Sequence, residues 1–115
     1  MDQLDIVQRT GTIADATVLG LQGPLTLGTL FQLQALLREP SLKNVIIDLS
    51  GVPYMDSGGL GVLLAHWSHA QRAGTKYALV GISPRVMTIF QITHTDSVLP
   101  IYATQEEAER AFIKP

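Results

Sequence analysis

The sequence predicts one α/β domain over residues 1–115, built on a mixed sheet of about five strands with about four helices. From residue 26 on, apolar segments of strand length alternate with segments whose apolar residues recur at the helical period. The first two strand-like segments are separated only by a turn, so this pair is expected to be antiparallel. Strands joined through helices run parallel, and the later half of the sheet should therefore be parallel.

Two strands are expected at residues 4–8 and 16–21. Pro24 ends the second strand, because proline has no N–H to donate to a ladder. Thr26 is then expected to cap a helix that Pro40 stops. The apolar positions of this helix are Leu27, Leu30, Phe31, Leu33, Leu36 and Leu37.

The β-branched run at residues 45–49 predicts a central strand, because every position except Asp48 is apolar. After a turn, a helix is expected over residues 57–73, and Gly74 should end it in the left-handed conformation. Its buried face is expected to consist of Leu60, Leu63, Leu64 and Trp67.

Residues 76–80 predict the next strand, and a short helix should follow it. Ser83 is the expected N-cap of this helix, and Pro84 suits its first position. The expected buried positions are Val86, Ile89 and Phe90.

The last strand is expected at residues 98–102, on an edge of the sheet because it contains Pro100. Thr104 and Glu107 have the spacing of a capping box, which predicts a final helix. That helix should pack through Ala108, Ala111 and Phe112.

Composition restricts the classes of function. A formal net charge of −2 offers no basic surface for nucleic acid. Without cysteine the chain has no disulfide, no thiolate metal site and no cysteine nucleophile. No apolar stretch approaches the ~18 residues of a membrane span, and the first residues lack the basic start and apolar centre of a signal peptide. We therefore expect a soluble, cytoplasmic protein without membrane insertion.

Residues 46–64 read IIDLSGVPYMDSGGLGVLL, which is a strand, a loop and the glycine-rich start of a helix. This segment resembles the signature of STAS domains and, within them, of bacterial anti-sigma factor antagonists. Residues 78–86, ALVGISPRV, are similar to the second recurring block of that family. The resemblance spans about the whole chain and implies a single STAS-type domain.

The resemblance implies a partner-switching regulator rather than an enzyme, with no cofactor. In this family an anti-sigma factor with serine kinase activity phosphorylates the serine that follows the aspartate of the motif. The unphosphorylated antagonist binds that kinase and frees a sigma factor, and a serine phosphatase resets the system. By position the phosphorylated residue would be Ser57, with Asp56 as the adjacent acid.

The chain departs from the family pattern at two places. Gly58 stands where the family has a second hydroxyl, so Ser57 is the one acceptor left in the motif. The family commonly has two acids in a Gly–Glu–Leu/Ile–Asp segment after the second strand. Residues 23–26 here are Gly–Pro–Leu–Thr, closer to the STAS domains of anion transporters. Thr26 thus lies at the expected partner contact without the usual charge.

The residues themselves leave two interpretations of the glycine-rich helix. Three glycines in one turn disfavour a helix by ~1 kcal/mol each relative to alanine, so close approach of another backbone is expected. Gly58, Gly61 and Ala65 fall along one edge of the helix, with Val62 beside them, and could form a docking strip for a partner. Alternatively, the glycines only let the helix pack against its neighbour, and Ser57 is a plain N-cap.

Other candidate sites have weaker support. His66 and His69 are one helical turn apart, but no third metal ligand is apparent, so two solvated histidines are favoured. Asp48 is interpreted as a turn residue. The glycines lack the lysine of a phosphate-binding loop, and Ser57 has no identifiable base. The alternatives to a switch are a constitutive interaction or scaffold module and, with less support, a nucleotide-binding or catalytic domain.

Overall fold

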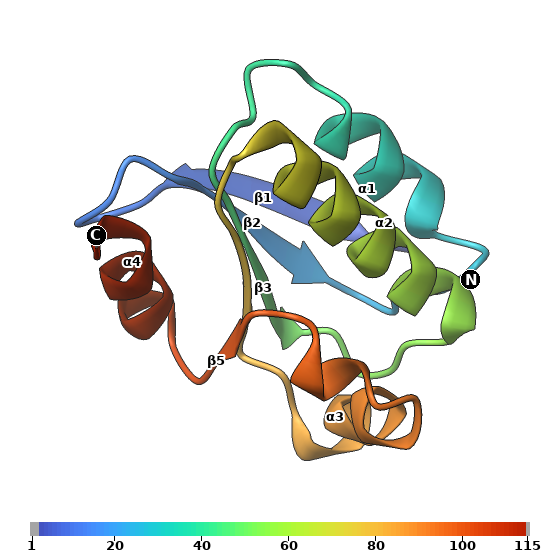
Figure 1. The fold of residues 1–115 in the computed structure, drawn as a ribbon. Helices are drawn as coiled ribbons and strands as arrows, with labels where there is room; N and C mark the ends of the chain where they lie inside the picture. Colours follow the sequence, from blue (N-terminus) through green and yellow to red (C-terminus); the bar gives the residue numbers. More distant parts are fainter. Residues whose placement is uncertain (1–2, 115) are drawn as a thin grey trace.

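Five strands form one mixed sheet, and their order in space follows the sequence, as Figure 1 shows. The first two strands are antiparallel, and every later pair is parallel, which confirms the predicted architecture. The structure is a computed structural model that describes residues 3–114. The strands are β1 (Asp5–Thr10), β2 (Thr17–Gln22), β3 (Val45–Gly51), β4 (Tyr77–Val80) and β5 (Ile101–Tyr102).

The helices cover the two faces of the sheet unequally. In Figure 1 two helices pack side by side on one face, one helix covers part of the other face, and one lies near the carboxyl end of β3. These are α1 (Leu30–Leu37) and α2 (Ser57–Ala73) on the first face, α4 (Gln105–Ile113) on the second, and α3 (Pro84–Ile92) at the end of the sheet.

Strand β3 is central and buried on both faces, as its apolar composition predicts. Val45, Ile47 and Leu49 point into the core beneath α1 and α2. Ile46 points the other way, into a smaller core that Phe112 of α4 helps to close. Alternate side chains of β3 therefore pack into two different cores. This packing fixes the carboxyl end of β3, where the loop toward α2 begins.

The first helix begins at Leu30, so the expectation that Thr26 caps it is wrong. The N–H of Thr26 donates to Thr29 Oγ1 at 2.9 Å, and the N–H of Leu27 donates to Asp56 Oδ2 at 3.0 Å. These bonds hold residues 26–29 as a loop. Leu27 and Phe31, two of the apolar positions of the predicted helix, are 65% and 63% exposed.

The last strand is shorter than expected, because a 3₁₀ helix (Thr95–Ser97) precedes it. The N–H groups of Val98 and Leu99 bond to the Thr95 carbonyl at 3.0 and 2.9 Å, which excludes these residues from the sheet. Only β5 remains, and its edge position is as predicted.

The predicted helix ends are largely confirmed. Gly74 ends α2 with φ of 71°, and Ser83 Oγ accepts from the Val86 N–H at 3.2 Å. Thr104 Oγ1 accepts from the N–H of Glu107. The carboxylate of Glu107 reaches the Ala103 N–H instead of that of Thr104, so the capping box is formed on one side only.

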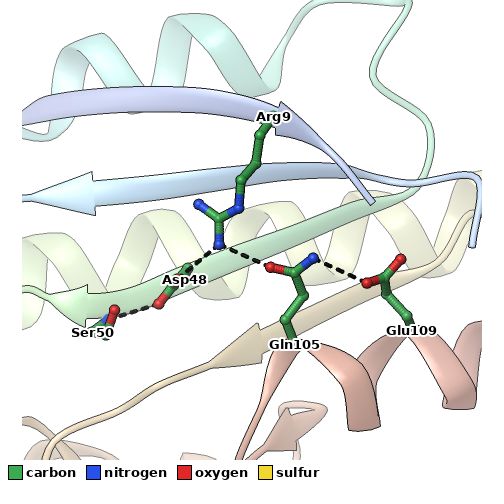
Figure 2. A network of polar contacts seen from close by, with 5 residues as sticks. All are labelled: Arg9, Asp48, Ser50, Gln105 and Glu109. Carbon is green, nitrogen blue, oxygen red and sulfur yellow. Dashed lines mark hydrogen bonds and ion pairs between the residues drawn. The ribbon is translucent and has the colours of Figure 1, made fainter. Parts of the chain in front are cut away.

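A polar network ties the amino-terminal hairpin to α4 across the sheet, as Figure 2 shows. Arg9 Nη2 donates to Asp48 Oδ2 at 3.0 Å and to Gln105 Oε1 at 2.9 Å, and Gln105 Nε2 donates to Glu109 Oε2 at 3.0 Å. Asp48 Oδ1 also accepts from the N–H of Ser50, but Asp48 lies within β3 rather than in a turn, so the turn role expected for it is wrong. The sequence pattern did not predict the ion pair between Arg9 and Asp48, because these residues are 39 positions apart.

Candidate functional site

Two loops lie side by side where the parallel strands end. The loop after β2 and the loop after β3 form a short parallel bridge between Leu25 and Met55. The N–H of Leu25 donates to the Tyr54 carbonyl at 3.2 Å, and the Asp56 N–H donates to the Leu25 carbonyl at 3.3 Å. Ligands of open α/β sheets bind at this end of the strands. The bridge brings the loop that contains Thr26 next to the start of α2.

Asp56 is the N-cap of α2, so the interpretation of Ser57 as a plain N-cap is wrong. Its Oδ1 accepts from the Gly59 N–H at 3.0 Å, and its Oδ2 accepts from the Leu27 N–H at 3.0 Å. Burial alone would raise the pKa of Asp56, but the backbone N–H groups of Gly59, Leu27 and Gly58 outweigh it and lower the pKa below its ordinary value. The carboxylate is thus ionised and engaged with both loops.

Ser57 is the first residue of α2, and its side chain is exposed. Its hydroxyl makes no hydrogen bond to any of residues 3–114. An N-cap hydroxyl would be occupied by a backbone N–H, whereas here Asp56 performs that role. The Ser57 hydroxyl is therefore available for chemistry without loss of the cap.

The glycines at the start of α2 serve different purposes. A Cβ on Gly59 would collide with the carbonyl oxygen of Leu25, and one on Gly58 would lie 3.1 Å from the backbone of Leu27. Both glycines thus permit α2 to approach the loop after β2, as the packing interpretation holds. A Cβ on Gly61 would meet nothing within 4 Å, so no contact within the described chain accounts for that glycine.

This difference predicts opposite effects of alanine at two glycines two positions apart. Gly59→Ala should lower the free energy of unfolding by more than ~1 kcal/mol, because the loop after β2 must move. Gly61→Ala should raise it by about 0.5–1 kcal/mol through helix propensity, because its side chain meets open space. Urea unfolding of both variants measures the difference. A stabilised Gly59→Ala would contradict the close approach described here.

The structure places most of the predicted partner-binding residues together. Ser57, Gly61 and Ala65 are exposed along one edge of α2, and Gly58 is half-buried at its start. Val62 is only 7% exposed, so it lies under the strip rather than on it. Thr26 is half-buried in the adjacent loop, where its Oγ1 accepts from the Gly28 N–H at 3.2 Å.

Two exposed apolar side chains, Leu27 and Phe31, extend this region. Leu27 adjoins Gly58 through its backbone, and Phe31 lies in the first turn of α1. The signal for their exposure was Gln34, which breaks the apolar row that Leu27 and Phe31 would continue. Together with the α2 edge they form a surface with small and apolar residues and few charges.

A metal site is not built by the described residues. No group of three or more His, Asp or Glu side chains among them could hold an ion. His66 is buried rather than solvated, with its ring edge-on to Tyr77 at 4.9 Å, so the expectation for this histidine is wrong. None of the described helices has both the length and the apolarity to cross a membrane.

Comparison with known proteins relates this geometry to a family. The sequence model of the STAS domain matches residues 4–108. The chain is 34% identical over 61 residues to the anti-sigma-B factor antagonist of Listeria monocytogenes, and the match spans 53% of this chain and 54% of that relative. The chain therefore aligns with about half the length of that curated relative.

Solved structures show the same fold. A putative anti-sigma factor antagonist from Thermotoga maritima superposes with a TM-score of 0.82 at 20% identity, covering 95% of both chains. The Bacillus cell fate determinant SpoIIAA in its phosphorylated form gives a TM-score of 0.69 at 19% identity, over 93% of this chain and 99% of that one. With the family model matching nearly the whole sequence, this chain belongs to the STAS domain family.

Proposed function

We propose that this protein is an anti-sigma factor antagonist that works by partner switching at Ser57. Unphosphorylated, it binds an anti-sigma factor that is also a serine kinase, and the kinase inactivates it by phosphorylating Ser57. A serine phosphatase restores the active form. The observation on which this rests is the exposed, unbonded hydroxyl of Ser57 beside a separate N-cap. The relatives named as anti-sigma factor antagonists support the same class of partner.

The electrostatics of the helix start favour a switch that leaves the fold intact. The α2 amino terminus attracts an anion through its dipole and its free N–H groups. Asp56 already occupies the N–H of Gly59 and that of Leu27, and its negative charge opposes a second anion. The attraction of the helix and the repulsion by Asp56 therefore nearly cancel for a phosphate on Ser57. The phosphate would project from an exposed position and change the stability of the fold little.

The same charge has a larger effect at an interface. The strip Gly58, Gly61 and Ala65 offers no basic side chain to a phosphate. A charge buried against a partner without a counter-ion costs ~3–5 kcal/mol, which corresponds to roughly two to four orders of magnitude in affinity. One phosphoryl group would thus separate the complex without a conformational change.

A constitutive interaction or scaffold module is the second candidate, and two departures from the family pattern favour it. Gly58 stands where the family has a second hydroxyl, and the acids expected at residues 23–26 are absent. A kinase that recognises those acids would find a neutral loop instead. This candidate uses the same docking surface but not the Ser57 hydroxyl.

Phosphopeptide mass spectrometry distinguishes the two. The protein is purified from its own cells under several growth conditions, together with whatever binds it. We expect phosphate on Ser57 and a kinase-like partner enriched with the unmodified fraction. A stable partner with no phosphate under any condition would establish the constitutive module and exclude the switch.

A further inference from the structure

A groove separates the second half of α1 from the middle of α2. It has a volume of about 280 Å³, just below the range of about 300–1,000 Å³ for small-molecule sites. Its lining combines apolar side chains with neutral and basic ones. The apolar residues are Leu37, Val62 and Ala65, and the polar residues are Gln34, Arg38, His66 and His69.

His66 is the buried polar group of this groove. It is 9% exposed, with its ring against Tyr77 and its centroid 5.8 Å from that of His69. Its nitrogens make no hydrogen bond to any of the described residues, and the Tyr77 hydroxyl donates to the Leu63 carbonyl. Because no buried side-chain nitrogen or oxygen among the described residues lacks a partner, the imidazole nitrogens reach the solvent in the groove. A ligand that enters the groove can replace that water as their hydrogen-bond partner.

The charges around the groove favour an anion. Neither α1 nor α2 contains an aspartate or glutamate. Arg38 forms no ion pair with a carboxylate among the described residues. Glu39 lines the adjoining hollow beyond Arg38, which disfavours a negative group there. An anionic head is therefore best accommodated between Arg38 and the two histidines.

We propose that this groove binds a small amphiphilic carboxylate. Its hydrocarbon chain would lie on Leu37, Val62 and Ala65, and its carboxylate would accept hydrogen bonds from His66 and Arg38, with His69 next to His66. Charge-assisted hydrogen bonds of this kind are stronger than neutral ones. The groove shares Val62 and Ala65 with the predicted partner surface but does not involve the Ser57 hydroxyl, so ligand binding by the protein alone tests it independently of the phosphorylation switch.

The test is an NMR titration of the full chain with sodium octanoate. We expect saturable shifts confined to amides of α1 and α2 that line the groove. Octylammonium, with the same chain and the opposite charge, should produce none. Arg38→Gln and His66→Phe should each weaken octanoate binding about tenfold or more. Arg72→Gln, on α2 but bonded to Ser68 outside the groove, is the matched control and should bind like the wild type.

A second measurement checks where the carboxylate sits. Burial and the neighbouring His69 lower the pKa of His66 in the free protein. A bound carboxylate should raise the pKa of His66, because its negative charge favours the imidazolium form. The positive charge of Arg38 opposes this rise, and Tyr77 is neutral and adds no charge. Equal binding of octan-1-ol and octanoate would indicate an adventitious additive only. That result, an unshifted His66, or unchanged binding by Arg38→Gln would overturn the proposal, even if His66→Phe does not fold.

Discussion

Ser57→Asp is expected to weaken binding to the partner anti-sigma factor by roughly two to four orders of magnitude, because it places a permanent charge in the docking surface. Its free energy of unfolding should change by less than about 0.5 kcal/mol, since the site is exposed and Asp56 retains the cap. Isothermal titration calorimetry with the partner and urea unfolding of the variant measure the two quantities.

Two control variants isolate the charge at this position. Ser57→Ala removes the hydroxyl without adding charge, so it should bind like the wild type and resist inactivation by the kinase. Ser41→Asp adds the same charge at an exposed serine between α1 and β3, and it should leave binding unchanged. If Ser57→Asp binds as tightly as the wild type, or if it unfolds the domain, the charge-block mechanism is wrong.

Most of the fold could be predicted because strand and helix periods are local properties. The run at residues 45–49 and the helix ended by Gly74 lie where their patterns place them. The late start of α1 could not be predicted, because a side chain from elsewhere in the sequence takes a backbone N–H. Asp56 binds the N–H of Leu27, 29 positions earlier, and delays the start of α1. No local pattern contains that bond.

The candidate site could be predicted in position but not in its details. The motif located Ser57 and its exposed strip, yet it did not show that Asp56 provides the cap. The motif also does not distinguish the roles of its three glycines. Gly58 and Gly59 permit close packing against the loop after β2, whereas Gly61 faces open space. That distinction depends on a loop whose path the sequence does not reveal.

Glu109→Gln is expected to lower the free energy of unfolding by about 2–3 kcal/mol at pH 7, because it alters a fully buried carboxylate. Glu109 Oε1 accepts from the N–H groups of Ile13 and Ala14 at 2.9 and 3.0 Å. Its Oε2 accepts from Thr12 Oγ1 at 3.1 Å and from Gln105 Nε2 at 3.0 Å. The bonds to Thr12, Ile13 and Ala14 join α4 to the turn between β1 and β2.

The dependence on pH shows whether the charge of Glu109 is responsible. Burial would raise the pKa of Glu109, but these hydrogen bonds outweigh it and lower the pKa to about 2, from an ordinary 4.5. A depressed pKa adds stability above pH 4.5 that is lost as the pH falls toward 2, about 3 kcal/mol in all. Wild type and Glu109→Gln should therefore converge in acid.

Urea unfolding at pH 7 and pH 3 measures that convergence, and comparing the two proteins cancels the titration of the other carboxylates. Glu106→Gln is the matched control on the same helix, because its partner Arg110 and its own side chain are exposed. It should change stability by no more than about 0.5 kcal/mol at either pH. A stability gap for Glu109→Gln that is the same at both pH values would mean that shape, not charge, holds the turn against α4.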